Sequence, residues 1–577
     1  MAPRDSIDIR QTSHDTPPTL LHCLLKWERE RPDAVYLTQP LADGTVADYT
    51  WREVADQARR MAAYLRGRNY PPGSSIAILG KNSAHWMIAD LAIWMAGHVS
   101  VPVYSTANAE TVSYVLDHSE AKLMFVGRLD GDEKGWLAVA SGVASGFPLI
   151  NLPLSARREG EQWDAIVAAT PPLDNVAMPD PAALATIIYT SGSTGTPKGV
   201  MHSFRTMCEV PRLAAVIINN GRGASHDDRM LSYLPLAHCA ERQGVESLSL
   251  CYGFRVYFSH DLTTFAADLH RARPTIFLSV PRLWIKFYQA VAQKISPRKQ
   301  RMAFRLPLVS GLLKKKLLAA LGLDQVATAF TGSAALPTEV ITWYRNLGLE
   351  LLDGYGMTEN YAYSHFNRPG GSARIGYVGP CLPGVEARLS EEGEILVKSP
   401  GLMMGYYKAS DDTADCFTPD GFLRTGDRGQ IDDQGYLRII GRVKDQFKTA
   451  KGKYVAPVPI EAKLGEHPRM ESVCVTGPGR SQPFVLATLN EETRRELAQG
   501  ADRDALAGEL EQLLDEVNAR LEPHERLDRI VVLRDAWTIE RGQMTPTMKI
   551  RRAVIENDFL WKSHQWDAVS ERVVFDQ

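Results

Sequence analysis

The sequence predicts an α/β protein with a large N-terminal domain of parallel-rich sheets sandwiched by helices, followed by a small α+β C-terminal domain. The chain has 577 residues, more than one hydrophobic core usually holds. Short β-branched runs alternate with segments of helical periodicity up to about Arg442, a pattern typical of parallel sheets covered on both faces. Beyond that point the pieces become shorter and more mixed. We therefore place the two domains at residues 1–441 and 442–577, joined around Gly441–Asp445.

The individual elements follow from their own patterns. Alternating or β-branched runs predict strands, and apolar residues at helical spacing predict helices. Strands are expected at 75–79, 99–104, 122–126, 186–189, 230–233, 254–258, 275–280 and 326–330, and helices at 85–96, 110–118 and 503–521. The most apolar stretch, 85–103, is interrupted by Asp90 and His98, so it predicts a buried helix and a strand rather than a membrane span.

Composition excludes several classes of protein. The chain is 44% hydrophobic and 23% charged with a net charge of −3, so no nucleic-acid-binding surface is expected. Its seven cysteines are scattered without a CxxC pair, which disfavours a zinc ribbon or a redox pair and favours reduced thiols in the cytoplasm. The first residues show no basic patch followed by an apolar run, so no secretory signal is expected.

One segment, 294–322, is rich in basic residues interspersed with leucines. Such a segment can be a basic amphipathic surface that contacts anionic lipid, which would make the protein peripherally membrane-associated. It can equally be a solvated helical face, and the sequence favours this simpler interpretation.

The strongest motif is a loop rich in glycine and hydroxyl groups, TSGSTGTPKG, directly after the apolar strand that ends at Tyr189. Glycine lets the backbone approach a ligand closely, and the N–H and hydroxyl groups can then surround phosphate oxygens. Candidate phosphate-binding residues are Thr190, Ser191, Gly192, Ser193, Thr194, Gly195 and Lys198. A Walker A loop is excluded because Lys198 is followed by Gly199 instead of Ser or Thr. Taken alone, the loop would also suit an ordinary surface turn.

This loop resembles the signature of the adenylate-forming superfamily, which includes acyl-CoA synthetases, luciferases and peptide-synthetase adenylation domains. The resemblance extends from about Tyr49 to Arg552 and implies the same two-domain fold, with a C-terminal domain that moves. It also implies that the loop orients the β- and γ-phosphates of ATP, with Thr194 among the catalytic residues.

Further motifs occur in the order that this family requires. SYLPLAH ends at His238, which the resemblance places beside the acyl carboxylate, and Glu241 and Arg242 follow as in the long-chain fatty acid group. TGSAALP follows a strand, and the resemblance places Gly332, Ser333 and Ala334 along the adenine pocket.

In DGYGMTE, Gly354 and Gly356 flank Tyr355, which can stack on a purine. Thr358 can reach a phosphate oxygen, and Glu359 is a candidate catalytic residue and Mg²⁺ ligand, since Mg²⁺ prefers one or two carboxylates plus phosphate.

The last motifs surround the domain junction and the C-terminus. Asp427, in RTGD, can accept hydrogen bonds from both ribose hydroxyls, and Arg442 can donate to the same ribose. The resemblance implies a hinge between the two domains at this junction, and it is either Lys444 or Asp445. Gly452, in FKTAKGKYVAP, belongs to a loop that the resemblance assigns to the pantetheine channel. TPTMK, which ends at Lys549, resembles the final family motif and makes Lys549 the catalytic lysine of adenylation.

Together these motifs predict ATP-dependent activation of a fatty acid, long-chain by resemblance, to acyl-AMP, followed by thioester formation with coenzyme A. ATP, Mg²⁺ and coenzyme A are the expected cofactors and co-substrates. Two alternatives stay open within enzymes: a ligase for another acid, such as an aromatic, medium-chain or amino acid, and one that loads a carrier-protein phosphopantetheine. An amino-acid substrate would require a carboxylate in its pocket, for which Glu241 is the nearby candidate. A non-catalytic nucleotide-binding scaffold is the alternative from another class.

Overall fold

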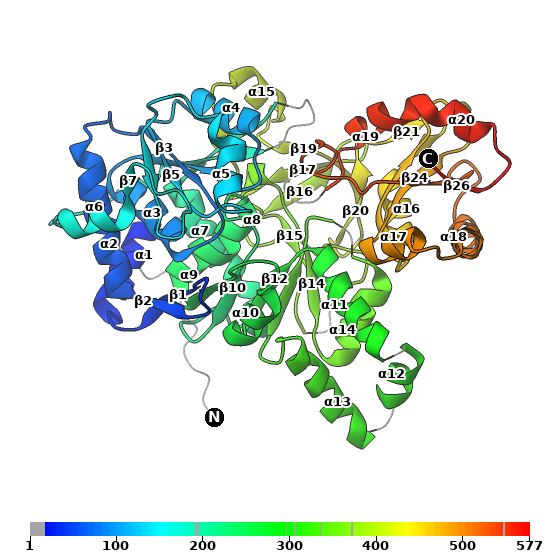
Figure 1. Ribbon diagram of the computed structural model, residues 1–577, viewed down its shortest axis with the longest axis horizontal. Helices are drawn as coiled ribbons and strands as arrows, with labels where there is room; N and C mark the ends of the chain where they lie inside the picture. The colour runs from blue at the N-terminus through cyan, green and yellow to red at the C-terminus, as the bar shows by residue number, and fades with distance from the viewer. Residues whose placement is uncertain are drawn as a thin grey trace.

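The structure is a computed structural model that describes residues 18–190, 196–295, 297–304, 307–334, 336–370, 373–545 and 549–576. The N-terminal part forms the bulk of the molecule, and the C-terminal part, orange to red in Figure 1, forms a smaller body at one end.

The largest sheet has eight strands in the order β18-β9-β8-β4-β3-β5-β6-β7. The strands from β8 to β7 are parallel neighbours, whereas β9 is antiparallel to both β8 and β18. Their bounds are β3 (Ser75–Leu79), β4 (Val99–Val103), β5 (Leu123–Val126), β6 (Leu149–Asn151), β7 (Glu161–Gln162), β8 (Leu184–Thr190), β9 (Lys198–Ser203) and β18 (Gly405–Tyr406).

Helices cover both faces of this sheet because successive side chains of a strand point to opposite faces. In β3, Ile76 and Ile78 join one hydrophobic cluster, while Ala77 and Leu79 join another. The first cluster is packed by α1 (Leu20–Glu30), α2 (Trp51–Gly67), α3 (Ala84–Met95), α7 (Phe204–Ala214) and α9 (Leu248–Tyr252), the second by α4 (Ala109–Ser119) and α5 (Glu133–Ala140).

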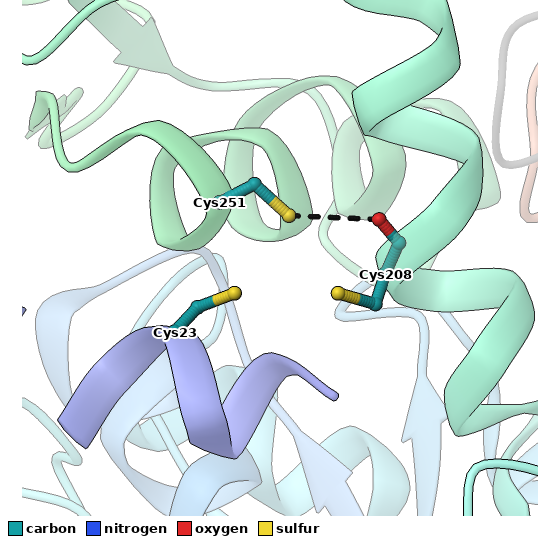
Figure 2. A group of neighbouring side chains, drawn as sticks. All are labelled: Cys23, Cys208 and Cys251. Carbon is teal, nitrogen blue, oxygen red and sulfur yellow. Dashed lines mark hydrogen bonds between the residues drawn. The ribbon is translucent and has the colours of Figure 1, made fainter. Parts of the chain in front are cut away.

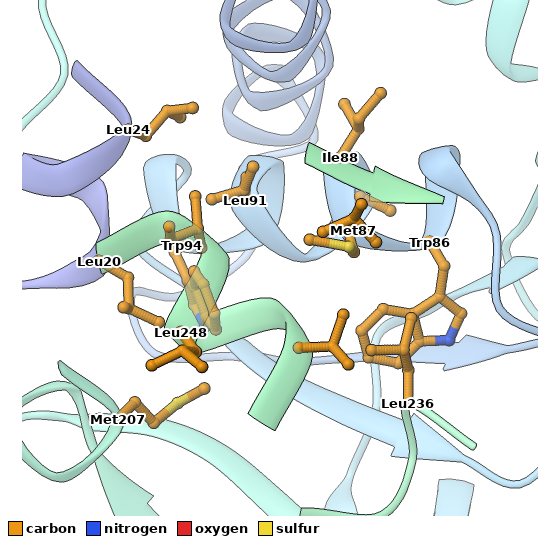
Figure 3. Packing of buried hydrophobic residues seen from close by; sticks show 14 of the residues in the cluster. Leu20, Leu24, Trp86, Met87, Ile88, Leu91, Trp94, Met207, Leu236 and Leu248 are labelled. Atoms are coloured by element: carbon orange, nitrogen blue, oxygen red, sulfur yellow. The ribbon is translucent and has the colours of Figure 1, made fainter. Parts of the chain in front are cut away.

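Helix α3 lies at the centre of the first cluster. All of its residues are buried, which explains the long apolar stretch in the sequence. Figure 3 shows Trp86, Met87 and Trp94 of this helix packed with residues that come from α1, α7 and α9. Asp90, the charge within this helix, is buried and forms an ion pair with Arg242.

Two four-stranded sheets complete the parallel-rich part, in the orders β10-β11-β1-β2 and β12-β13-β14-β15, each with one antiparallel edge strand. Their strands are β1 (Val35–Pro40), β2 (Val46–Thr50), β10 (Arg229–Ser232), β11 (Arg255–Phe258), β12 (Ile276–Ser279), β13 (Thr328–Thr331), β14 (Leu351–Tyr355) and β15 (His365–Phe366). The other helical segments between residues 163 and 360 include α6 (Trp163–Ala169), η1 (Ala215–Gly221), α8 (Cys239–Glu241), η2 (Arg242–Ser247), α10 (Phe265–Ala272), α11 (Pro281–Lys294), α14 (Thr338–Leu347) and η3 (Thr358–Asn360).

Helices α12 (Pro297–Phe304) and α13 (Pro307–Ala320) carry the basic segment and project from the body of the molecule (Figure 1). Met302 and Leu312 are 72% and 66% exposed on these helices. Within the described ranges, every helix is too short or too polar to span a membrane.

An antiparallel sheet, β16-β17-β19-β20, leads to the C-terminal part. It consists of β16 (Glu386–Leu389), β17 (Glu394–Lys398), β19 (Leu423–Ile431) and β20 (Leu437–Arg442), with α15 (Ser410–Asp415) between β17 and β19 in the chain. After β20 follow β21 (Phe447–Lys448), β22 (Tyr454–Val455), α16 (Pro457–Leu464), β23 (Met470–Thr476), β24 (Phe484–Leu489), α17 (Glu491–Ala498), α18 (Arg503–Asn518), β25 (Ile530–Leu533), α19 (Arg552–Phe559), η4 (Leu560–Lys562), α20 (Ser563–Asp567) and β26 (Val573–Phe575).

The C-terminal part has hydrophobic clusters of its own, on the two faces of the sheet β23-β24-β25-β26. All the buried residues of these clusters come from Phe447 onward. The α/β architecture with two unequal parts is therefore confirmed, and each strand and helix predicted above lies within three residues of an observed element. The boundary at 441/442 stays a prediction.

Candidate active site

The predicted phosphate loop connects two antiparallel strands at the edge of the large sheet. Thr190, the last residue of β8, pairs with Lys198, the first residue of β9. Five loop residues lie outside the described part of the chain: Ser191, Gly192, Ser193, Thr194 and Gly195. The structure therefore fixes the two ends of the loop.

The side chain of Lys198 lies in a polar, aromatic environment. Its Nζ is 3.0 Å from Oδ2 of Asp412 and 4.9 Å from the ring centroid of Tyr406. Both partners and Lys198 line a cavity of about 150 Å³ beside the loop. A cation is thus positioned next to the loop and is balanced by one carboxylate.

Glu359 is half-buried close to this lysine. The hydroxyl of Tyr406 donates to Oε1 of Glu359 at 2.9 Å. Tyr406 therefore contacts both the candidate metal ligand and the candidate phosphate lysine. Among the described residues, none donates a hydrogen bond to Oε2 of Glu359, so this oxygen fits a hard cation that takes oxygen ligands. The preceding Thr358 is buried, and its hydroxyl lies 3.5 Å from Sγ of Cys239.

Two parallel strands, β13 and β14, end side by side. Gly332 follows β13 and Gly354 lies in β14, and a Cβ at Gly332 would lie 3.2 Å from the carbonyl oxygen of Gly354. Ser333 adopts a left-handed φ of 73°, and Ala334 beside it is exposed. A Cβ at Gly356 would lie 2.4 Å from the backbone of Ala362, so a larger residue cannot fit there.

Asp427, Arg442 and Tyr355 form one polar group. The hydroxyl of Tyr355 donates to Oδ2 of Asp427 at 2.7 Å, and Nε of Arg442 lies 3.2 Å from Oδ1. Asp427 and Arg442 face each other across the β19–β20 pair. A carboxylate has about four acceptor positions, so Asp427 can accept further hydrogen bonds.

His238 caps the short helix α8, and its Nδ1 accepts a hydrogen bond from the backbone N–H of Ala240 at 3.2 Å. Burial and, as the smaller cause, the positive charge of Lys549 lower the pKa of His238 to about 4. The ring is therefore neutral at pH 7, with its proton on Nε2.

Glu241 is turned away from a ligand role. It is buried, and its Oε1 accepts hydrogen bonds from Ser232 Oγ at 2.8 Å and from the backbone N–H of Tyr233 at 3.1 Å. Burial raises the pKa of Glu241 to about 8. This side chain holds α8 against β10 and does not offer a free carboxylate to an amine.

Arg242 is wholly buried and connects this segment to the core. It forms ion pairs with Asp90 and with Glu246, and it donates to the hydroxyl of Thr186 on β8 at 2.8 Å. Removal of one member of such a buried group would leave a charge without a partner. Glu241 and Arg242 thus hold the segment that follows His238 against the core, and their charged groups are not available to a ligand.

Lys549 comes from the C-terminal part but lies at the same site. Burial lowers the pKa of Lys549, and the positive charge of Arg442 lowers it further, whereas Asp427 and Cys239 raise it. Part of the Lys549 side chain is exposed to solvent. The loss of water that lowers its pKa therefore comes from the protein packed around its ammonium group and not from complete enclosure. Its backbone N–H donates to Oγ1 of Thr545 at 3.0 Å.

The structure does not bring Gly452 to this site. Gly452 has a φ of 71° in the exposed turn between β21 and β22, and the turn contacts the 477–480 segment of its own part. Lys444 is exposed and Asp445 half-buried in the turn after β20. The choice between them as hinge stays open.

Two residues of the site were not predicted: Tyr406 and Asp412. Tyr406 lies in a two-residue strand, β18, which is too short to show a strand pattern in the sequence. The only signal is its place in the GYYK stretch, where aromatic residues follow a glycine. Its pairing with β9 brings it next to Lys198.

The arrangement is suited to binding a polyanion and stabilising negative charge. Two cations, Lys198 and Lys549, come from distant parts of the chain, and a carboxylate for a metal lies near the first. Beside the second, Asp427 and Arg442 can bind a polyol such as ribose. Positioned cations of this kind act electrostatically on a phosphoryl centre.

Comparison with known proteins identifies the class. The AMP-binding enzyme family matches residues 24–407, and the AMP-binding enzyme C-terminal domain matches residues 444–562. The chain belongs to the AMP-binding, adenylate-forming superfamily. It is an AMP-forming ligase that adenylates a carboxylic acid with ATP.

Individual relatives are ligases of long-chain fatty acids. The chain is 31% identical to the long-chain-fatty-acid–CoA ligase FadD15 of Mycobacterium tuberculosis, over 92% of this chain and 94% of the relative. It is 28% identical to the long-chain-fatty-acid–CoA ligase 1 of Homo sapiens, over 89% of this chain and 81% of the relative.

Solved structures share the fold at lower identity. The A-PCP didomain of carboxylic acid reductase from Segniliparus rugosus, in complex with AMP, has a TM-score of 0.79 and 23% identity, covering 96% of this chain and 83% of that one. A benzoate CoA ligase from Burkholderia xenovorans LB400 has a TM-score of 0.73 and 22% identity, covering 93% and 100%.

Proposed function

We propose that the protein is a long-chain fatty acid–CoA ligase, which converts a fatty acid to acyl-AMP and then to the coenzyme A thioester. The observation that carries the adenylation half is the convergence of Lys549 with Asp427, Arg442 and His238, which come from both parts of the chain. The choice of acid and of acceptor rests on the relatives, whose names specify long-chain fatty acids and CoA.

In the first reaction, a carboxylate oxygen of the acid bonds to the α-phosphorus of ATP, and the bond to pyrophosphate breaks. Lys198 and the loop from Thr190 hold the leaving phosphates, Tyr355 packs the adenine, and Asp427 with Arg442 binds the ribose. Lys549 offsets the charge that accumulates between the carboxylate and the α-phosphate. Because His238 is neutral, it can lie beside the acyl group without neutralising the attacking carboxylate.

Glu359 is the proposed ligand of Mg²⁺, and Tyr406 holds its carboxylate in place. The residues fit this ion: Glu359 is half-buried, and one of its oxygens accepts no hydrogen bond from the part of the chain that the structure describes. Such a carboxylate is the ligand type that Mg²⁺ takes together with phosphate. When bound, the ion supplies positive charge to the triphosphate.

In the second reaction, the thiol sulfur of coenzyme A bonds to the acyl carbonyl carbon, AMP leaves, and the thiol proton is released. The Gly452 turn lies away from the nucleotide residues in this structure. Its proposed role in the pantetheine channel therefore requires rotation of the C-terminal part around Lys444 or Asp445, as in the two-pose cycle that the family resemblance implies.

Activation of an amino acid would require a free carboxylate to bind the amine. Glu241 does not supply it, because its carboxyl is buried and accepts hydrogen bonds from Ser232 and from the backbone of Tyr233. The decisive experiment is a panel of short, medium, long and aromatic acids, assayed for AMP release with free coenzyme A and with a holo carrier protein. Long-chain acids with coenzyme A should give the highest kcat/KM. A preference for aromatic acids or for the carrier protein would refute the proposal while leaving the adenylating class intact.

The projecting helices α12 and α13 support a proposed peripheral contact with anionic membranes. Exposed Met302 and Leu312 lie on the same pair of helices as Lys315 and Lys316, which are also exposed. Basic residues near a bilayer surface are attracted to anionic lipid, with about 1 kcal/mol per residue. Lys315→Glu/Lys316→Glu should reduce sedimentation with anionic vesicles and leave neutral vesicles unaffected; equal sedimentation of both proteins would exclude this surface.

A further inference from the structure

Three cysteines that are far apart in the sequence converge at one point outside the nucleotide site. Cys23 lies on α1, Cys208 on α7 and Cys251 on α9. Their Sγ atoms all lie within 4.8 Å of one another. Figure 2 shows the three side chains directed toward a common space between the helices. Their wide spacing in the sequence gave no sign of this arrangement.

The spacing of the sulfurs is close to that of a metal–thiolate centre. With metal–sulfur bonds of about 2.3 Å, three thiolates around one ion have sulfurs about 4 Å apart. Each sulfur would have to move by no more than about 0.5 Å toward the centre to bind such an ion. A disulfide would require a sulfur–sulfur distance of about 2.05 Å and would leave the third thiol unused, so the three-fold convergence favours an ion.

The three thiols lie where α1, α7 and α9 pack together. Cys208 is one of the buried residues of the first hydrophobic cluster, and Cys23 and Cys251, which are partly exposed, pack against that cluster. Thiolates are the form that binds metals, so an ion would bind here with loss of the thiol protons.

The ligand set selects the kind of ion. Thiolates favour soft cations such as Cu⁺ and Zn²⁺ over Mg²⁺ or Ca²⁺. Among the described residues, the group contains no fourth histidine, cysteine or carboxylate, whereas structural zinc sites have four protein ligands. A soft monovalent ion of low coordination number therefore matches the site better than Zn²⁺.

We propose that Cys23, Cys208 and Cys251 form a binding site for a soft thiophilic cation, with Cu⁺ as the best match. Binding forms three metal–sulfur bonds and releases to solvent the protons of those thiols that are not already ionised, with no change in the oxidation state of sulfur. The bound ion links α1, α7 and α9. Of these, α7 directly follows the strand that begins at Lys198, and α9 follows the segment that begins at His238.

Copper binding can be measured on the reduced full-length protein with Cu⁺ supplied from a competing chelator. We expect one Cu⁺ per chain after desalting. The variant Cys23→Ser/Cys208→Ser/Cys251→Ser should lose this binding, whereas the control Cys381→Ser/Cys416→Ser should retain it. Equal uptake by the triple variant, or retention of Zn²⁺ in place of Cu⁺, would overturn the proposal.

Alkylation of the wild-type protein provides a test that does not depend on folding of the variant. With one equivalent of Cu⁺, N-ethylmaleimide labelling of Cys23 and Cys251 should slow at least tenfold, while labelling of Cys416 should be unchanged. Peptide mapping that finds unchanged labelling, or a disulfide among the three cysteines in place of metal uptake, would refute the site. Neither result would bear on the ligase assignment, because none of the three residues belongs to the nucleotide site.

Discussion

The hydroxyl of Tyr355 donates a 2.7 Å hydrogen bond to Asp427, which links the residue proposed to pack adenine to the carboxylate proposed to hold ribose. The same carboxylate pairs with Arg442 at the edge of the C-terminal part. In the proposed function, nucleotide binding and the approach of the C-terminal part therefore both depend on the side chain of Asp427.

Asp427→Ala should weaken ATP binding by about 10- to 100-fold, because hydrogen bonds to a charged group contribute about 1.5–3 kcal/mol. Calorimetry with a non-hydrolysable ATP analogue measures this dissociation constant. Asp433→Ala is a matched control, since Asp433 is exposed in the turn between the same two strands. An unchanged affinity in Asp427→Ala would remove Asp427 from the nucleotide site.

Lys549→Ala should reduce adenylation by at least about 10²-fold, as expected for loss of one group that stabilises transition-state charge. Conversion of pre-formed acyl-AMP to thioester should change little. Acid-dependent pyrophosphate release and single-turnover thioester formation measure the two steps separately, with Lys463→Ala on α16 as the control. An equal loss in both steps would contradict the two-pose assignment.

The pH dependence of adenylation should report the ammonium group of Lys549. Because burial and Arg442 lower the pKa of Lys549, its charge is lost as pH rises at a lower pH than for an ordinary lysine. The rate should therefore fall on the alkaline side below about pH 10.4, the ordinary lysine value. Lys549→Arg stays charged and should lose this alkaline limb. A limb that persists in Lys549→Arg belongs to another group.

Tyr406→Phe should raise the Mg²⁺ concentration needed for half-maximal adenylation by about two- to tenfold, the effect of one hydrogen bond worth about 0.5–1.5 kcal/mol. The physical reason is that Glu359 loses the hydroxyl that orients Oε1. Tyr407→Phe serves as the control, since the ring of Tyr407 packs against His118 instead. Identical Mg²⁺ dependence in both variants would show that the hydroxyl does not position Glu359.

Glu241 should make stability depend on pH. Its pKa of about 8 lies above the ordinary value of 4.5, so the folded chain binds a proton more tightly than the unfolded chain. The resulting stability is complete below pH 4.5 and is lost as pH rises through about 8, by up to about 1.4 kcal/mol per pH unit. Asp353, whose pKa burial also raises to about 8, adds a loss of the same sign.

Glu241→Gln should consequently show a smaller decrease in Tm than the wild type between about pH 5.5 and about pH 7.5. Glu110→Gln, on the exposed first turn of α4, should behave as the wild type does. If Glu241→Gln and the wild type lose the same Tm over this range, the carboxyl of Glu241 is not protonated in the fold.

Sequence patterns predicted an element well where all of its residues are buried. The run at 75–79 coincides with β3, because all five residues are buried and the two β-branched residues, Ile76 and Ile78, alternate with Ser75, Ala77 and Leu79. The 85–96 pattern predicted α3 within one residue of its observed bounds. By contrast, β18 was not predicted, because it has two residues and pairs with β9, about two hundred positions earlier in the sequence.

The candidate site was predicted in its parts but not in its connections. The sequence pointed to Glu359, Asp427 and Lys549, and the structure places Asp427 and Lys549 in electrostatic contact. It did not reveal that Tyr406 joins Glu359 to the surroundings of Lys198, since this contact requires the pairing of β18 with β9. Nor could it separate Glu241 and Arg242 from ligand-binding residues, because their burial depends on Asp90, Thr186 and Ser232 from other segments.

The pairing of Lys198 with Asp412 has a consequence for competition among anions in the cell. An anion that takes the lysine must displace a carboxylate that is already in place. Inorganic phosphate or sulfate, each offering few contacts, would exchange one partner for another with little gain. In the proposed function, a triphosphate tail would also be held by the other groups assigned to its binding, so the Asp412 carboxylate would select against anions that bind through Lys198 alone.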